Sequence, residues 1–228
     1  SGALISEGGP TPCTLTSRGS ERLRFVLASS SPARADLLRQ IGLRFDVVPS
    51  GIAEDIGPGN DLAKDVEALA LAKARHVART ERDAVVIAAD TVIMLDGMVL
   101  GKPADAEDAR GMLQRMSGRW HEVISGLAVL DAASGREAAC HEITHVRMTK
   151  LTLEIADKYV STGEPLGKAG AYAIQGRGAL LVDRIVGCYF NVVGLPIARL
   201  RDLLARVGVG VDCLLVPFVH HEGHTGGR

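Results

Sequence analysis

DAVVIAADTVIMLDGMVLGKP, residues 83–103, decides the fold because it combines a buried strand, an acidic residue, a tight turn and a lysine. Residues 85–89 form a short, continuous apolar run rich in valine and isoleucine, as found in strands that are covered on both faces. Asp90 follows this run and is expected to interrupt it. The stretch therefore predicts a strand that carries a carboxylate at its end.

The same stretch also predicts a β-hairpin. Asp96-Gly97 is the dipeptide that a type I′ turn prefers, since both central residues need positive φ. The apolar runs 92–95 and 98–100 flank this turn. With a two-residue loop, Ile93 lies opposite Leu100.

In this register Thr91 lies opposite Lys102, so an acid, a hydroxyl and an ammonium come together in space. A regular ladder would place Thr91 and Lys102 on one face and Asp90 on the other. Both charges then reach one ligand only where the strand twists or bulges, for which Gly101 is a candidate. The alternative is a surface hairpin on which Asp90 and Lys102 are solvated.

The composition favours a single globular domain with an enzyme-like balance of residues. The chain has 228 residues, 46% of them hydrophobic, and a net charge of −1. It therefore lacks the basic footprint of a nucleic-acid-binding protein. Its four cysteines contain no C-x-x-C pair, so a reducing, cytoplasmic setting is expected.

The chain shows no repeat or linker that would divide it. No apolar stretch approaches the length of a transmembrane helix, and the first residues lack a signal-peptide pattern, so no membrane partner is expected. We expect a disordered N-terminal extension over residues 1–22, one domain over residues 23–210, and a C-terminal tail over residues 211–228.

Residues 24–42 predict a strand, a hydroxyl-rich turn and a helix. Ser31 suits the N-cap, Pro32 suits the first helical position, and Gly42 suits the left-handed stop. The helix N-terminus, three adjacent serines and Arg34 form a cradle for an anion, most naturally phosphate. The alternative is an ordinary capped helix with Arg34 on its solvated face.

A lysine in an apolar stripe marks the next helix, predicted over residues 61–80. Lys73 follows Leu69 at i+4 on the side that faces the core. Either its stem carries the ammonium to the surface, or the ammonium reaches a buried anion. The Gly/Pro-rich loop 49–60 before this helix carries the acid Glu54.

The remaining pattern alternates strands and helices. His121 lies in a long β-run and is more simply explained as a structural histidine than as a ligand. The Gly-rich segment 163–178 allows close approach of the backbone to a ligand. Strands are expected at 45–48, 120–130, 137–148, 179–186 and 189–193, and helices at 105–118, 152–161 and 196–207.

Five motifs in this order make the chain resemble the Maf family of nucleotide pyrophosphatases from about residue 25 to residue 207. They are LASSSPARADLL, AADTVIMLDGMVLGKP, MSGRWHEVISGLAV, GKAGAYAIQGRGALLVDRIVG and NVVGLPI. The resemblance implies an α/β fold like that of inosine-triphosphate pyrophosphatases. Such a fold has a central mixed twisted sheet, helices on both sides and a cleft between two lobes.

The resemblance also implies hydrolysis of a nucleoside triphosphate to a monophosphate and pyrophosphate, with a divalent metal cation (Mg²⁺, or Mn²⁺ or Co²⁺). The partner that the resemblance implies is a small-molecule nucleotide substrate. A homodimer is compatible with the resemblance. Ser29 and Arg34 match triphosphate contacts beside Ser31. The catalytic residues that the motifs imply are Asp90, Lys102, Glu54 and Lys73.

Three further positions bear on the substrate. Thr91 and Gln175 match the branch of the family that prefers dTTP and UTP. Ala33 departs from the pattern, because this branch often has arginine there and the branch for methylated guanine nucleotides has tryptophan. A phosphate or base contact is therefore missing at position 33.

Elementary chemistry supports the same reaction. Cations and a helix N-terminus would bind the triphosphate, and the α-phosphorus needs an attacking water. Asp90 could accept the water's proton, or hold Mg²⁺ jointly with Glu54. The alternatives to this function are a regulator of septum formation that acts by binding, and a pyrophosphatase for modified purine nucleotides.

Overall fold

The structure is a computed structural model that describes residues 23–53 and 61–210. Its centre is the strand β3, Ala84–Leu95, which runs unbroken for 12 residues. Asp90 pairs with Gly126 in the middle of the ladder between β3 and β5, Trp120–Asp131. The prediction that Asp90 interrupts the strand and marks its end was therefore wrong. The carboxylate is tolerated inside the ladder because Lys73 of the helix that packs on it forms a buried ion pair with it.

The other strands extend this pair into one mixed sheet. Its order is β2-β1-β3-β5-β6-β7, and β4 also pairs with β3. The strands β1 and β2 run parallel to β3 or to each other, whereas β4, β5, β6 and β7 pair antiparallel. The bounds are Arg24–Leu27 for β1, Asp46–Val47 for β2, Met98–Leu100 for β4, Arg136–Met148 for β6 and Val182–Val186 for β7.

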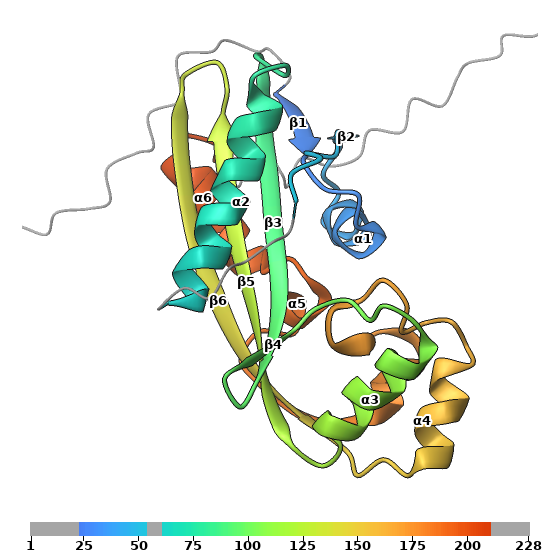
Figure 1. The fold of residues 1–228 in the computed structure, drawn as a ribbon. Helices are drawn as coiled ribbons and strands as arrows, with labels where there is room; N and C mark the ends of the chain where they lie inside the picture. The colour runs from blue at the N-terminus through green and yellow to red at the C-terminus, as the bar shows by residue number, and fades with distance from the viewer. Residues whose placement is uncertain (1–22, 54–60, 211–228) are drawn as a thin grey trace, which may run out of the picture.

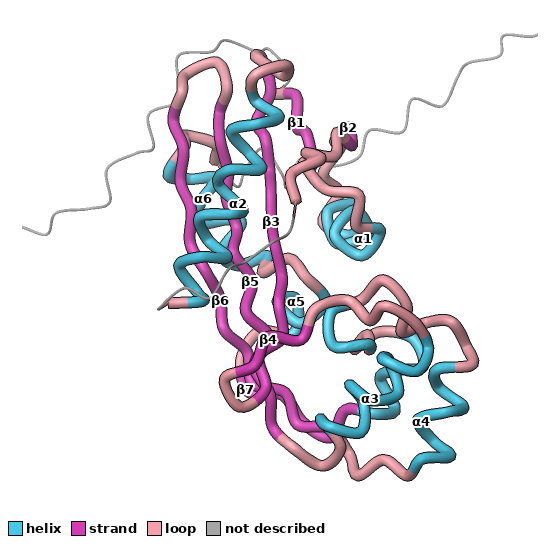
Figure 2. The backbone as a smooth tube through the Cα atoms, in the orientation of Figure 1, coloured by secondary structure: helices cyan, strands magenta, loops and turns pink. Residues whose placement is uncertain are grey.

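Helices cover both faces of the sheet, as the family resemblance implied. α2, Leu62–Ala78, crosses one face, and α6, Ile197–Arg206, lies on the other with α1, Pro32–Gln40 (Figure 1). α3, Ala106–Met116, and α4, Leu153–Val160, pack around the far end of the sheet and form a second lobe (Figure 2).

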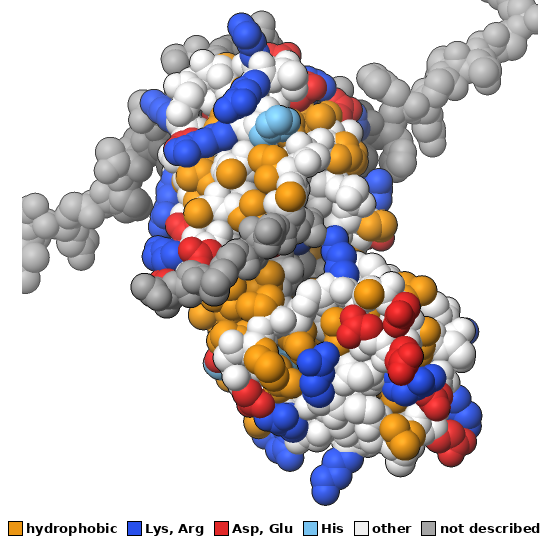
Figure 3. Space-filling model, in the orientation of Figure 1, with side chains coloured by type: hydrophobic (Ala, Val, Ile, Leu, Met, Phe, Trp, Pro, Cys, Tyr) orange, Lys and Arg blue, Asp and Glu red, His pale blue; other side chains and the backbone are white. Residues whose placement is uncertain are grey.

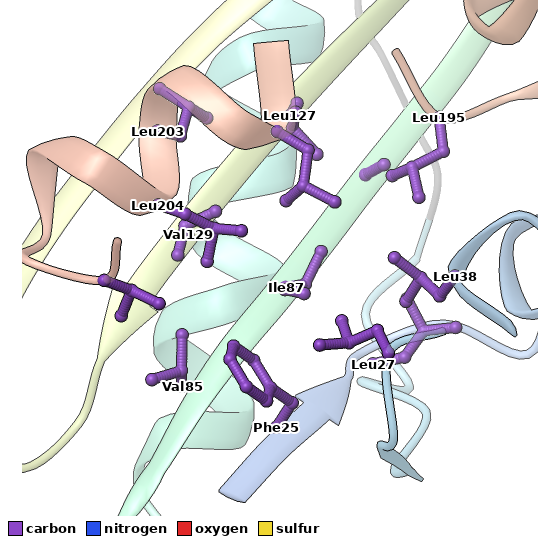
Figure 4. Packing of buried hydrophobic residues seen from close by; sticks show 14 of the residues in the cluster. Phe25, Leu27, Leu38, Val85, Ile87, Leu127, Val129, Leu195, Leu203 and Leu204 are labelled. Atoms are coloured by element: carbon purple, nitrogen blue, oxygen red, sulfur yellow. The ribbon is translucent and has the colours of Figure 1, made fainter. Parts of the chain in front are cut away.

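Alternate residues of β3 enter the cores on opposite faces. Val85 and Ile87 pack against α1 and α6 in one cluster, together with Phe25 of β1 (Figure 4). Val86 and Ala88 pack against α2 in another. The period of two along the strand therefore decides which side chains of β3 face which helix.

The local signals predicted most element boundaries. Ser31 and Thr152 cap α1 and α4 as predicted, with side chains that accept hydrogen bonds from the backbone of Arg34 and Ile155. The hairpin has the expected register, with Ile93 opposite Leu100. Asp96 and Gly97 both have positive φ, as a type I′ turn requires.

Two predicted strands were wrong in whole or in part. Tyr189–Val193 forms the helix α5, and the residues before β7 form a 3₁₀ helix, Gly176–Leu181. A short apolar run has no period that separates strand from helix. The predicted extension 1–22 and tail 211–228 lie outside the described residues, and the domain bounds stay a prediction.

None of the helices in residues 23–53 and 61–210 has the length and apolar character that crossing a membrane requires.

Candidate active site

The candidate site lies at a gap along one edge of β3. β5 pairs along the opposite edge, while β1 pairs with β3 only as far as Leu27 opposite Ile87, and β4 pairs only from Leu100 opposite Ile93. Residues 88–92 therefore have no strand beside them on this edge within the described chain. Asp90 and Thr91, neighbours whose side chains point to opposite faces of the sheet, both border this gap, so one ligand can contact both.

A cavity of about 320 Å³ opens at the gap. Its size falls within the range of small-molecule sites. In the space-filling view, the two lobes meet at a narrow waist (Figure 3). The predicted site residues that line the cavity are Ser29, Ser31, Ala33, Arg34, Asp90, Thr91, Lys102 and Gln175.

Arg34 is held inside the predicted anion cradle. Its side chain is buried, and its guanidinium donates to Ser29 Oγ at 3.0 Å, to Thr91 Oγ1 at 3.1 Å and to the carbonyl of Gly194 at 3.0 Å. The backbone N–H of Arg34 points to the hydroxyl of Ser31. The alternative of a solvated arginine on an ordinary helix was therefore wrong.

Lys73 reaches a buried anion, which was the less ordinary of the two alternatives. Its Nζ lies 2.6 Å from Asp90 Oδ1, and both residues are 3% exposed. Gly126, opposite Asp90, permits the close approach of α2, since a Cβ there would lie 2.1 Å from the carbonyl oxygen of Val66. Lys73 stands behind Asp90 and is not among the lining residues.

Glu54, the remaining predicted site residue, lies outside the described residues. Asp90 is the acidic side chain that lines the described part of the cavity. The described residues contain no cluster of three histidine, cysteine or acidic side chains that would hold a metal by itself. One carboxylate together with substrate phosphates is nevertheless a usual set of ligands for Mg²⁺, so the donors present fit this ion.

The loop that carries Gln175 is braced by a carboxylate. Glu164 accepts hydrogen bonds from the backbone N–H of Gly178 at 2.8 Å and of Arg177 at 3.1 Å, and from the hydroxyl of Tyr159 at 2.9 Å. Partial burial works against ionisation, but these donors lower the pKa of Glu164 overall. The brace fixes the backbone directly after Gln175, whose exposed side chain borders the cavity.

Sequence reasoning missed several residues of this site. Lys168 and Tyr172 line the cavity. The one sequence signal for this position was that both lie in the Gly-rich segment 163–178. The hydroxyl of Tyr172 lies 2.7 Å from Nε2 of His121, which is buried as expected of a structural histidine. Burial lowers the pKa of His121 to about 4. Ser125 supports Thr91 from the next strand, and no local pattern signals it.

A family model and several curated proteins match most of the chain. A family model described as "Maf-like protein" matches residues 24–207. A "dTTP/UTP pyrophosphatase" of Pelotomaculum thermopropionicum is 52% identical over 186 residues, covering 82% of this chain and 97% of that protein. A protein of the same name from Moorella thermoacetica is 52% identical over 188 residues, covering 82% of this chain and 97% of that protein.

One solved structure, a "Nucleoside-triphosphatase / dITP/XTP pyrophosphatase" of Mycobacterium abscessus, aligns with a TM-score of 0.38 and 17% identity, over 57% of this chain and 76% of that chain.

Proposed function

The chain belongs to the Maf-like protein family, and we propose that it hydrolyses dTTP and UTP to the monophosphate and pyrophosphate, which removes unwanted nucleotides from the pool. The observation that carries this proposal is the cavity beside β3, where a guanidinium, an ammonium and a carboxylate meet. The names of the relatives given above support the choice of substrate.

Binding of the triphosphate follows from the charges that line the cavity. Arg34 and Lys102 supply positive charge, and the start of α1 supplies backbone N–H groups and hydroxyls. Arg34 is fixed by three hydrogen bonds, so little of its side-chain entropy remains to be lost when the phosphates bind. The site therefore orients the triphosphate with preorganised cations.

The chemical step is the attack of water on the α-phosphorus. The water oxygen forms a bond to phosphorus, the bond from the α-phosphorus to the bridging oxygen breaks, and pyrophosphate leaves with the electron pair. In the first of two alternative roles, Asp90 accepts the proton that the water loses; in either role, Lys73 fixes the position of this carboxylate through the buried ion pair. Lys102 stabilises the negative charge that builds up on the phosphates.

We further propose that Mg²⁺, or Mn²⁺ or Co²⁺ in its place, binds with the substrate. Asp90 would hold the ion, and the family resemblance adds Glu54. A bound divalent cation neutralises phosphate charge and polarises the phosphoryl oxygens. Asp90 then acts either as this ligand or as the base, and a metal titration of Asp90→Asn separates the two roles, since only loss of a ligand raises the metal concentration needed for half-maximal activity.

Selectivity for thymine and uracil is assigned to Gln175, whose amide offers both a donor and an acceptor at the border of the cavity. The pyrimidine carbonyls and N3–H present the complementary pattern. The cytoplasmic location and the homodimer expected from the sequence are part of this proposal. Light scattering on the purified protein tests the dimer.

The experiment is a panel of dTTP, UTP, dCTP, dGTP and dITP incubated with Mg²⁺ or Mn²⁺ and assayed for pyrophosphate. We expect the highest kcat/KM for dTTP and UTP and one pyrophosphate for each monophosphate. Preference for dITP or dGTP would contradict the assigned substrate. Release of inorganic phosphate in place of pyrophosphate would contradict the assigned bond, and no turnover at all would favour a protein that acts by binding.

A further inference from the structure

The hydroxyl of Thr91 is hydrogen-bonded to other side chains of the protein. It accepts a hydrogen bond from Arg34 at 3.1 Å and lies 2.9 Å from the hydroxyl of Ser125, the residue that pairs with it on β5. We propose that Thr91 and Ser125 are positioning residues that aim Arg34 at the triphosphate, and that Thr91 does not select the base. This inference rests on the proposed function, since it names what part of the substrate the site recognises.

The direction of the hydrogen bonds supports this role. A guanidinium only donates, so Thr91 Oγ1 is the acceptor for Arg34. Thr91 has one proton, and it can be donated to Ser125, whose own hydroxyl lies 3.5 Å from the carbonyl of Asn191. A chain of donors running from Arg34 through Thr91 and Ser125 uses each hydroxyl proton once. With the donors in this order, Thr91 has no proton left for a carbonyl of the nucleobase.

This chain of hydrogen bonds ends on buried residues. Ser125 and Asn191 are both 0% exposed. The amide of Asn191 donates to the carbonyl of Val123 at 3.0 Å and to Thr144 Oγ1 at 3.0 Å, which ties α5 to β5 and β6. α5 leads directly to Gly194, whose carbonyl accepts from Nε of Arg34. Two of the three acceptors that hold the guanidinium, Thr91 and Gly194, are therefore tied to the same buried network.

If Thr91 positions Arg34, its substitution should affect all nucleoside triphosphates alike, because they share the phosphate groups. Arg34 would contact phosphate, so a loss of its alignment weakens every triphosphate by a similar factor. A residue that read the base would instead change the ratio between pyrimidine and purine substrates. The same change should also weaken tripolyphosphate, which has no base.

The test compares Thr91→Val, Thr91→Ser and Ser125→Ala with wild type, and Thr149→Val serves as the matched control. Thr149 is half-buried and bonds to the carbonyl of Leu181 in the other lobe, away from the cavity. The readouts are the Kd of tripolyphosphate by calorimetry, and kcat and KM for dTTP, UTP and dGTP. Thermal unfolding of each variant identifies any that fails to fold.

We expect Thr91→Val to raise the Kd of tripolyphosphate and the KM of all three nucleotides by roughly tenfold or more, the fold-change equivalent of one hydrogen bond to a charged group. Thr91→Ser should restore most of this loss, and Ser125→Ala should shift the same readouts in the same direction. In an Arg34→Ala background, Thr91→Val should have little further effect, because the two residues act as one unit.

The inference is overturned if Thr91→Val changes the ratio of dTTP to dGTP while the Kd of tripolyphosphate stays at the wild-type value. It is equally overturned if the effects of Thr91→Val and Arg34→Ala are additive, or if Thr149→Val has the same effect as Thr91→Val. Should Thr91→Val fail to fold, Thr91→Ser and Ser125→Ala carry the same comparison. If wild type turns over no nucleotide, the proposed function fails, yet tripolyphosphate binding still tests the role of Thr91.

Discussion

Lys73 Nζ lies 2.6 Å from Asp90 Oδ1, and less than a tenth of either side chain is exposed. Removing two charges from water is costly, and a buried pair regains this cost only with good geometry. An apolar pair of similar volume would serve stability at least as well. The ion pair is therefore better explained by the need for a fixed carboxylate beside the cavity than by stability.

Asp90→Asn tests the catalytic carboxylate, since it preserves shape and removes the charge. We predict a fall in kcat of about a hundredfold or more, the usual contribution of a general base. The measurement is pyrophosphate release from dTTP by protein that remains folded, as judged by circular dichroism. Activity within about tenfold of wild type would show that Asp90 does no catalytic work.

The cost of the buried pair appears when one partner is removed. We predict that Lys73→Met lowers the free energy of unfolding by about 3–5 kcal/mol, because it leaves Asp90 buried without its cation. The double variant Lys73→Met/Asp90→Leu should recover most of this loss. Lys64→Met is the matched control on α2: its exposed pair with Glu67, at 3.4 Å, should matter by no more than about 1 kcal/mol.

Urea denaturation of the four proteins provides these free energies. A double variant as unstable as Lys73→Met would mean that the lysine contributes through its packing and not through its charge.

Local features of the fold were predictable because their signals lie within a few residues of each other. Ser31 and Pro32 specify the start of α1 through one hydrogen bond and one fixed dihedral angle. The dipeptide Asp96-Gly97 specifies the turn, and the turn in turn specifies the register of Ile93 with Leu100. In each case the free-energy difference that decides the structure is local.

Long-range partners could not be predicted from the residues alone. Lys73 in an apolar stripe showed that something unusual occurs, but its partner lies 17 residues away on another element. Ser125 has no signal of its own, because only the pairing of β3 with β5 places it beside Thr91. α5 was missed since its five residues are held by the tertiary bonds of Asn191, which a helical period cannot reveal in so short a run.

Ala33→Arg tests whether the second residue of α1 faces the substrate. Ala33 lines the cavity, one residue before the buried Arg34. We predict a lower KM for dTTP, by up to about tenfold, because an arginine there would add a charge-assisted hydrogen bond to phosphate less the cost of ordering it. The measurement is kcat/KM for dTTP in Ala33→Arg, Arg177→Ala and the double variant.

Arg177 is exposed and is not among the lining residues of the cavity, so its removal should leave the gain unchanged. A gain that appears only in the double variant would show that Arg177 already fills this space. Absence of a gain in both backgrounds would mean that position 33 does not face the phosphates.

Glu164→Ala tests the brace behind Gln175. Loss of the carboxylate frees the backbone of Arg177 and Gly178, so we predict a higher KM for dTTP, by about tenfold, with an unchanged Kd for tripolyphosphate. Glu154→Ala is the control, because that glutamate forms an exposed pair with Lys158. Weaker tripolyphosphate binding in Glu164→Ala would show that the brace supports the phosphate site instead.

His121 should make the stability of the protein depend on pH. Burial lowers its pKa in the folded protein from 6.5 to about 4, so between these values the unfolded chain binds a proton that the folded chain does not. The free energy of unfolding therefore falls as the pH decreases from 6.5 toward 4, with a slope of up to about 1.4 kcal/mol per pH unit. Nδ1 of His121 is buried without a partner among the described residues, so a proton there would gain no hydrogen bond.

The variant His121→Gln isolates this contribution, because an amide keeps a partner for the hydroxyl of Tyr172 and does not titrate. Glu164 has a lowered pKa and destabilises the fold in the same direction at acidic pH, but it does so equally in both proteins. Urea denaturation from pH 4.5 to 7.5 should give a steeper dependence for wild type than for His121→Gln, with the two curves converging in slope above about pH 7. Parallel curves throughout this range would mean that the folded protein admits the proton on His121, and that the contact with Tyr172 opens readily enough for solvent to reach the ring.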